Sequence, residues 1–553
     1  MTRSSNLRAL AAFAVAVLGA CAPAAPPAPA PSPVSVEARP TPPAAPPAPA
    51  PTAARPHEAP RDWQLLDDSI DHVSGISAER AYRELLAGKA PKRTVLVAVI
   101  DGGIDTTHAA LRPILWSNPK EVGGNGKDDD ANGYVDDVRG WNFIGGKGGD
   151  VQYDQLELTR LYSRCKKAPA SAGDETPRCP KIIEEFDKQR SETDQTLAQY
   201  RPAIAELRAL RRAMGGGTLT ADRVRAYLPA SAELREAREF FLRLAQDGGT
   251  LELLETGLKE LEARAKYQLD PSYDSRAIVG DNYADPAERH YGNSDVMGPD
   301  ALHGTHVSGI IGATRVGADG IRGVAPAVKI MMVRTVPDGD ERDKDVANAI
   351  RYAVDNGANV INMSFGKGYS PYKGAVDAAV KYADAHGVLL VHAAGNDGAD
   401  IEATPNFPTP NFNGSGRAQN WIEVGASSWK GADSLAAPFS NYGHDLVDVF
   451  APGEDILSSV PGGGYERLSG TSMAAPVVTG LAALLMDYYP TLTASDVKRI
   501  ILQTATSHKD QLVLRPGAKD GEKVPFGTLS STGGIVNAYA ALRMAEQITA
   551  LKP

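Results

Sequence analysis

The chain is organised around residues 469–486, which read Ser469-Gly470-Thr471-Ser472-Met473-Ala474-Ala475-Pro476-Val477-Val478-Thr479-Gly480-Leu481-Ala482-Ala483-Leu484-Leu485-Met486. A short turn of small polar residues leads into an apolar run that is long enough for a buried helix. Ser472 would then lie at a helix N-terminus, where unpaired backbone N–H groups and the positive end of the helix dipole face its hydroxyl. This environment suits a nucleophile, although Ser and Thr are also preferred simply as helix N-caps.

Three other stretches decide between these two interpretations. A buried-strand pattern over residues 95–100 ends on Asp101, the sequence His303-Gly304-Thr305-His306 opens a helix of small residues, and a strand pattern over residues 388–392 leads to Asn396. Acid, His, Asn and Ser in this chain order resemble the subtilisin-like serine peptidases. The resemblance extends from about residue 60 to residue 545, apart from one long insertion, and favours the nucleophile.

This resemblance assigns a role to each of the four residues. It implies that Ser472 attacks, that His303 takes its proton, and that Asp101 holds the imidazole. It also implies that the Asn396 amide and the Ser472 backbone N–H stabilise the oxyanion. His306 is the alternative base and Asp105 the alternative acid, but the family's catalytic histidine comes first in its motif, and we expect Asp105 to be structural.

A further segment, Ser364-Phe365-Gly366, resembles the strand that pairs with extended substrate in this family. Phe365 is equally compatible with an ordinary core position.

Between residues 328 and 425, apolar strand patterns alternate with helical patterns, which indicates a parallel sheet. We therefore predict an α/β fold, a subtilisin-like parallel sheet covered by helices on both faces. Ligand sites in such sheets lie at the carboxyl ends of strands, where Asp101 and Asn396 would be placed.

The first 56 residues predict export rather than folded structure. Residues 1–20 combine Arg3 and Arg8 with a short apolar core, as in a signal peptide, and Leu18-Gly19-Ala20-Cys21 resembles a bacterial lipobox. Cleavage before Cys21 and its lipidation would anchor an exported bacterial lipoprotein in the cell envelope, at the outer membrane or the periplasmic face. An ordinary secretory peptide is the alternative. Residues 21–56, rich in Pro and Ala, would form an extended linker.

The catalytic domain is predicted in two parts, residues 57–150 and 271–548, separated by a mainly helical insertion over residues 151–270. Leucines recur there at helical spacing, and these apolar stripes are expected to be core. Cys165 and Cys179 are the cysteines that remain after Cys21, an even number in an exported protein, so we expect a disulfide between them.

An acidic loop predicts a structural Ca²⁺ site. Asp128, Asp130, Asn132, a glycine in sixth place and Asp136 in ninth place match the first part of an EF-hand loop. The twelfth position is Arg139 instead of a bidentate Glu, so the EF-hand is incomplete, and a solvated acidic turn is the alternative.

Net charge and the absence of one motif exclude further classes of function. A net charge of −10 argues against a nucleic-acid partner, and no organic cofactor is expected. The Gly-x-Ser-x-Gly elbow of esterases is absent around Ser472. The sequence therefore predicts a membrane-tethered serine endopeptidase that acts on proteins or peptides through an acyl-enzyme. The alternative is an inactive scaffold that binds proteins through the helical insertion.

Overall fold

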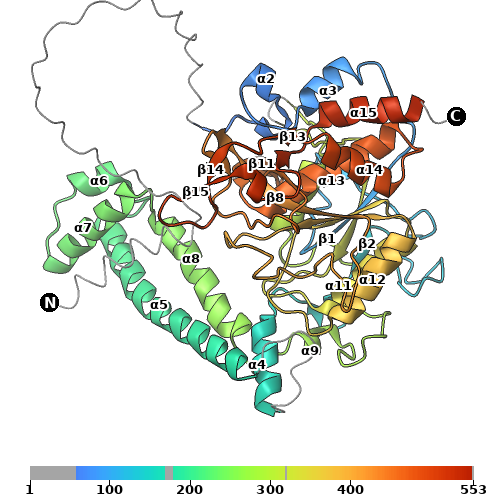
Figure 1. Cartoon of the computed structure of the whole chain (residues 1–553). Coiled ribbons are helices and arrows are strands. Elements are labelled where there is room, and N and C mark those ends of the chain that lie inside the picture. The colour runs from blue at the N-terminus through green and yellow to red at the C-terminus, as the bar shows by residue number, and fades with distance from the viewer. Residues whose placement is uncertain (1–57, 168–178, 318–319, 551–553) are drawn as a thin grey trace, which may run out of the picture. The chain divides into compact units, whose positions relative to one another are not determined.

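A mostly parallel β-sheet forms the centre of the computed structural model, which describes residues 58–167, 179–317 and 320–550 (Figure 1). Its strand order is β13-β16-β10-β8-β7-β6-β1-β5-β2, and β9 (Ser434–Ala436) pairs with β8 off this path. Every neighbouring pair from β16 to β2 is parallel, whereas β13 and β9 pair antiparallel. The strands along the path are β13 (Thr506–Ser507), β16 (Gly534–Ile535), β10 (Val449–Pro452), β8 (Trp421–Gly431), β7 (Leu389–Ala393), β6 (Val360–Met363), β1 (Leu96–Asp101), β5 (Lys329–Arg334) and β2 (Gly140–Asn142).

Both faces of this sheet are buried, as its continuous apolar strands predict. Val97 and Val99 of β1 belong to one hydrophobic cluster, and Ala98 and Ile100 belong to the other. The alternation follows from the two-residue period of a strand, which sends successive side chains to opposite faces. The predicted α/β fold with helices on both faces is confirmed.

Helices cover the two faces in separate groups. Helices α10 and α13 pack in the first cluster, and α11 and α12 pack in the second, on the opposite side of β1 (Figure 1). The helices of the catalytic part are α2 (Asp68–Asp71), α3 (Ala78–Glu84), α9 (Arg276–Val279), α10 (Leu302–Gly312), α11 (Asp343–Asp355), α12 (Lys373–Ala385), α13 (Thr471–Tyr488), α14 (Ala494–Gln503) and α15 (Ala538–Ala550).

Helix α13 is the central helix. Within the described residues it is the one helix long and apolar enough to cross a bilayer, but 94% of its apolar window is buried inside the protein. Its hydrophobicity is therefore that of a core helix, and along its length Ser472 is the residue that remains partly exposed.

The carboxyl ends of three adjacent strands bring candidate residues to one edge of the sheet. Strands β7, β6 and β1 are neighbours in the sheet. Asp101 is the last residue of β1, Ser364 follows β6 directly, and Asn396 lies three residues beyond β7. Their proximity is thus a consequence of the sheet topology.

The insertion is helical where the structure describes it. It consists of α4 (Glu157–Lys167), α5 (Cys179–Ala213), α6 (Ala221–Ala226), α7 (Ala232–Gln246), α8 (Leu251–Ala263) and the π-helical turn η3 (Arg264–Gln268). Residues 199–258 belong to a smaller structural unit, and the larger unit comprises Ala59–Ala198 and Lys259–Pro553. In the smaller unit, Ile204 and Leu207 of α5 and Leu251 of α8 are buried, as the spacing of the apolar residues predicts. Arg208 Nε and Glu255 Oε1 form an ion pair at 2.5 Å.

Cys165 and Cys179 form a disulfide between α4 and α5, with their Cα atoms 5.5 Å apart. This is the pairing expected from the sequence.

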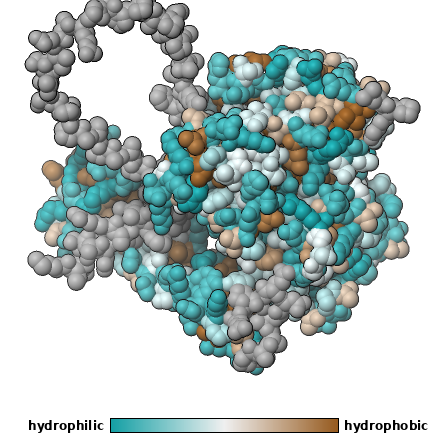
Figure 2. Space-filling model, in the orientation of Figure 1, coloured by the Kyte–Doolittle hydropathy of each residue, from teal (hydrophilic) through white to brown (hydrophobic). Residues whose placement is uncertain are grey.

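Short elements complete the description. The 3₁₀ turns are η1 (Trp63–Leu65), η2 (Arg112–Ile114) and η4 (Phe526–Thr528), and the hairpins pair β11 (Ile456–Val460) with β12 (Gly464–Leu468), β14 (Leu512–Leu514) with β15 (Lys523–Pro525), and β3 (Gly145–Gly146) with β4 (Gly149–Asp150). Hydrophilic side chains dominate the visible face of the larger unit, broken by small hydrophobic patches (Figure 2).

Candidate active site

His303 and Asp101 form a hydrogen-bonded pair at the carboxyl edge of the sheet. The Nδ1 atom of His303 lies 2.9 Å from both carboxylate oxygens of Asp101. Because an ionised carboxylate only accepts hydrogen bonds, Nδ1 carries the proton and Nε2 keeps a free lone pair. Asp101 is 2% exposed, and Gly102 donates a further backbone hydrogen bond to its Oδ1 at 2.7 Å. The imidazole is therefore held in the tautomer that a general base needs.

The glycine after His303 allows this approach. A Cβ atom on Gly304 would lie 2.2 Å from the carbonyl oxygen of Gly103 and 3.2 Å from Asp101 Cβ. Helix α10 can therefore begin against the end of β1 only because position 304 has no side chain.

The Asp101 carboxylate also shifts the titration of His303. Burial disfavours the charged imidazolium, but the charge of Asp101 and its hydrogen bond outweigh this, so the pKa of His303 is raised above 6.5. The side chain of His303 is 43% exposed, so the ring is accessible from the cleft.

Ser472 occupies the second position of α13, after the N-cap residue Gly470. Its backbone N–H lies in the first turn, where N–H groups have no partner within the helix. Its hydroxyl donates to the carbonyl oxygen of Ser364 at 3.1 Å, and the hydroxyl of Ser364 donates to the Ser472 carbonyl at 2.9 Å. The nucleophile candidate is thus held against the residue that follows β6.

Asn396 is oriented by Thr471, a residue that sequence reasoning did not single out. The backbone N–H of Thr471 donates to Asn396 Oδ1 at 2.8 Å, and the Thr471 hydroxyl lies 3.0 Å from the same oxygen. Since a backbone N–H can only donate, the carbonyl end of Asn396 faces Thr471, and the amide nitrogen is directed elsewhere on an exposed side chain. The one signal in the sequence is that Thr471 directly precedes Ser472.

The two alternative residues, His306 and Asp105, are buried and hydrogen-bonded to other parts of the protein. His306 is fully buried, its Nε2 lies 3.1 Å from the carbonyl oxygen of Glu466, and burial lowers its pKa to about 4. Asp105 is 1% exposed and accepts hydrogen bonds from Thr107 and from the backbone of Gly462. Burial would raise the pKa of Asp105, but these hydrogen bonds outweigh it and lower the pKa.

Ser364, Phe365 and Gly366 line a cavity of 310 Å³ together with Asp101 and His303. Phe365 is 8% exposed and lies within a hydrophobic cluster, so its side chain is core while its backbone follows the cleft. The segment is therefore placed where an extended peptide could pair with it.

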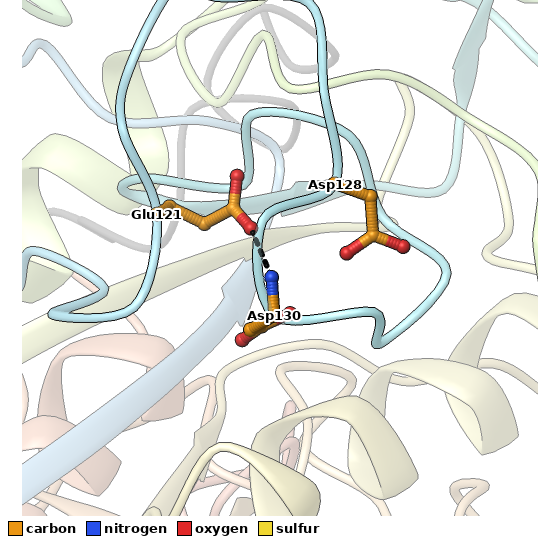
Figure 3. Close-up of side chains that lie close together, drawn as sticks. All are labelled: Glu121, Asp128 and Asp130. Carbon is orange, nitrogen blue, oxygen red and sulfur yellow. Dashed lines mark hydrogen bonds between the residues drawn. The ribbon is translucent and has the colours of Figure 1, made fainter.

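The acidic loop brings together a different set of oxygens from the one predicted. Glu121, Asp128 and Asp130 each offer an oxygen within 4.8 Å of the others, and Figure 3 shows their side chains on neighbouring stretches of loop. Glu121 Oε1 also accepts the backbone N–H groups of Asp129 and Asp130 at 2.8 and 3.2 Å. Burial, with the nearby carboxylates Asp137 and Asp130, raises the pKa of Glu121 despite these bonds.

The other two predicted ligands, Asn132 and Asp136, accept backbone N–H groups of the loop in this structure. The side-chain oxygen of Asn132 accepts the backbone N–H of Tyr134 at 2.8 Å, and Asp136 accepts those of Asn125 and Gly126 at 3.1 and 2.9 Å. Asp136 has a left-handed backbone, with φ 55°. The assignment of Asn132 and Asp136 as ligands stays a prediction, and Glu121 was missed because it lies outside the loop motif. Cys21, the predicted lipidation site, lies outside the described residues.

Comparison with known proteins gives one family. The model of the Subtilase family of peptidases matches residues 92–519. A thermophilic serine proteinase of Bacillus sp. (strain AK1) is 41% identical over 216 residues, which are 39% of this chain and 48% of the relative. Subtilisin DY of Bacillus licheniformis is 36% identical over 219 residues, 39% of this chain and 74% of that protein.

The matched region of this chain spans about half the length of the first of these relatives. A solved structure of the prenylagaramide maturation protease PagA is 30% identical, with a TM-score of 0.36, and the match covers 44% of this chain and 82% of that one.

Proposed function

The chain belongs to the subtilase family, and we therefore propose that it is a serine endopeptidase that hydrolyses peptide bonds in proteins or peptides. The observation that carries this proposal is the His303–Asp101 pair, with Nδ1 2.9 Å from both carboxylate oxygens, at the sheet edge that also presents Ser472. An imidazole with a fixed tautomer and a free Nε2 is what an otherwise unreactive serine requires.

In the first step His303 Nε2 accepts the Ser472 proton while Oγ attacks the substrate carbonyl carbon. The hydroxyl must first turn from the Ser364 carbonyl, its partner in this structure, toward the imidazole. Catalytic hydrogen bonds often tighten only when substrate is bound. His303 then passes the proton to the leaving amine, and water hydrolyses the acyl-enzyme by the reverse sequence.

Negative charge develops on the substrate oxygen in each transition state. The Asn396 amide and the Ser472 backbone N–H are the donors that would stabilise it. Thr471 supports this role because it binds the carbonyl end of Asn396 and thereby directs the amide end away from itself.

The inactive-scaffold alternative is not favoured. A protein retained only for binding has no need of a buried carboxylate hydrogen-bonded to a partly exposed histidine.

The proposal is tested with internally quenched peptides of varied sequence and mass analysis of the products. We expect cleavage at internal bonds, blocked by a fluorophosphonate. Intact peptides after incubation with folded protein, with and without Ca²⁺, would contradict it.

The pH dependence of cleavage should report His303. Protonated His303 cannot accept a proton, so kcat/KM should fall as pH falls through its pKa, which Asp101 raises above 6.5. The acidic limb of the profile should therefore lie above pH 6.5. Because burial raises the pKa of the nearby Glu341 to about 8, the profile is also recorded for Glu341→Gln. An acidic limb well below pH 6.5 in both proteins would rule out this assignment.

We also propose that the enzyme is a lipoprotein anchored to the cell envelope through Cys21. The support is the lipobox-like sequence Leu18-Gly19-Ala20-Cys21 behind a short apolar core. Cys21→Ser should move the protein from the membrane fraction to the soluble fraction of a bacterial host and abolish incorporation of labelled palmitate. Cys165→Ser is the matched control and should leave the labelling in place. Labelled Cys21→Ser protein would disprove the anchor.

Finally, we propose that Glu121, Asp128 and Asp130 hold a structural Ca²⁺. Three hard oxygen donors within 4.8 Å suit this ion, and the Oε2 atom of Glu121 is buried without a hydrogen-bond partner among the described residues. A bound cation would relieve the repulsion between these carboxylates.

Removal of Ca²⁺ should lower stability. At a Ca²⁺ concentration 100-fold above Kd, binding contributes about 2.7 kcal/mol, which corresponds to a Tm change of about 5 °C for a large domain. Thermal unfolding is compared in Ca²⁺ and in chelator. Asp128→Asn/Asp130→Asn should lose the difference, and the exposed control Asp510→Asn should keep it. A wild-type Tm that does not respond to Ca²⁺ would refute the site.

A further inference from the structure

The cavity beside His303 extends away from the catalytic residues toward the root of the insertion. Gln152, just before the insertion's first helix, is among its lining residues, and Gln268 at the end of η3 donates to Asp338 Oδ1 at 2.7 Å. The backbone N–H of Asp338 in turn donates to the carbonyl oxygen of Gln152 at 2.7 Å. Gln152 and Gln268, at the two ends of the insertion, thus hold Asp338 in one wall of the cavity through hydrogen bonds.

Three carboxylates outside the catalytic pair line this cavity: Asp300, Asp338 and Glu341. Asp300 and Asp338 are both exposed residues, although the Asp338 carboxyl is partly covered where Gln268 donates to it. Burial of its carboxyl raises the pKa of Asp338, and the charge of Asp300 raises it further, although the Gln268 amide opposes this. The two charges therefore repel each other, and a cation placed between them would be attracted by both.

Of the three carboxyl groups, Glu341 has the least compensation from its surroundings. It is 2% exposed, and its Oε1 has no hydrogen-bond partner among the described residues. A buried carboxylate oxygen without a partner is costly. The nearby cation Lys367 is already paired with Glu157 and Asp343, at 3.1 and 2.8 Å. Burial raises the pKa of Glu341 to about 8, so near neutral pH this carboxyl is largely protonated and offers an unpaired hydrogen-bonding group, which a bound cation would favour in its ionised form.

Arg334 is the one arginine or lysine among the described residues that line the cavity; its charge acts on Asp300, but its hydrogen-bond donors are directed elsewhere. Its guanidinium donates to Gly102 O at 2.7 Å, to Asn142 Oδ1 at 3.1 Å and to the carbonyl oxygen of Val151. Its N–H donors are thus occupied by backbone and amide oxygens and do not bind the carboxyl groups of the cavity. The cavity therefore keeps an excess of negative charge.

We propose that this cavity is an acidic subsite that binds a cationic side chain, Arg or Lys, of the peptide substrate close to the cleaved bond. The inference rests on the proposed peptidase function and adds a specificity to it. A peptide side chain fits better than a metal ion, because the described acidic group with oxygens close enough for one ion is Glu121, Asp128 and Asp130. A guanidinium or ammonium group can instead satisfy several separated carboxylates.

The test compares two sets of quenched peptides that carry arginine or citrulline, its neutral isostere, at each position near the cleaved bond in turn. At one position we expect wild-type kcat/KM to favour arginine by about tenfold or more, as charge pairs across interfaces do. Asp300→Asn/Asp338→Asn should reduce this ratio about tenfold. Glu341→Gln should reduce it about threefold or more. The control Asp510→Asn/Asp520→Asn removes the same net charge at exposed residues outside the cavity and should leave the ratio unchanged.

Binding to the Ser472→Ala variant gives the same ratio without turnover, by fluorescence anisotropy of the labelled peptides. A ratio near one at every position in wild type, or a ratio that the Asp300/Asp338 variant leaves intact, would overturn the subsite. Both results are compatible with cleavage of neutral peptides, so neither contradicts the proposed peptidase function. Loss of all cleavage with a preserved arginine preference in binding would instead contradict only the proposed catalysis.

Discussion

Ser472→Ala should abolish peptide cleavage and labelling by a fluorophosphonate probe. We expect kcat to fall about 10⁶-fold, the magnitude known for removal of the nucleophile in a related serine peptidase. The physical reason is that alanine has no oxygen to form the acyl-enzyme, so His303 and the oxyanion donors have nothing to activate. The measurement is gel fluorescence after labelling, together with initial rates on quenched peptides.

The matched control is Ser469→Ala, which removes an exposed hydroxyl three residues earlier. That hydroxyl accepts the backbone N–H of Asp455 at 2.9 Å, and the two residues flank the β11–β12 hairpin. Labelling should persist in this control. Undiminished labelling or cleavage in folded Ser472→Ala protein would show that another residue is the nucleophile.

Asn396→Ala should lower kcat about 10²–10³-fold and change KM little. An amide that binds the oxyanion acts mainly in the transition state, and its loss costs about 3 kcal/mol there, a magnitude established on a related subtilisin. Steady-state kinetics on one peptide separate the two constants. Fluorophosphonate labelling should slow as well, because that reaction also develops charge on an oxygen.

Asn413→Ala provides the comparison, since Asn413 is exposed and the hydrogen bond it donates to Asp377 comes from its backbone, which the substitution keeps. A large KM effect with an unchanged kcat in Asn396→Ala would indicate a substrate-binding role in place of oxyanion stabilisation.

The sheet and its helices were predictable because they follow local patterns. Apolar runs such as residues 95–100 are buried on both faces in a parallel sheet, and α13 has a continuous apolar sequence. The insertion's helices were predictable from apolar spacing, but the length of α5, which continues through Pro202, was not. Proline disfavours a helix interior, so the sequence favours a break at Pro202 that the structure does not have.

Of the residues in the proposed sites, only those that stand in a recognisable sequence motif were predictable. Asp101, His303, Asn396 and Ser472 stand in short motifs; the sheet topology brings Asp101 and Asn396 to one edge, where His303 of α10 contacts Asp101 and Ser472 of α13 contacts Ser364. Glu121 stands outside the loop motif, and its approach to Asp128 depends on the backbone turns between them, which include the left-handed Gly124 and Gly126. Glu341 gives no signal in the sequence, because its missing hydrogen-bond partner is a property of the packed interior.

His303 lies 202 positions after Asp101 in the sequence, so the ribosome adds it well after Asp101. At a synthesis rate of about 5–20 residues per second, about 10–40 s pass between the addition of Asp101 and that of His303. Asn396 and Ser472 are added later still, and α13 packs against strands made long before it. On the proposed assignment, the nascent polypeptide lacks its nucleophile until most of its length exists, so it could not cleave itself or its neighbours before then.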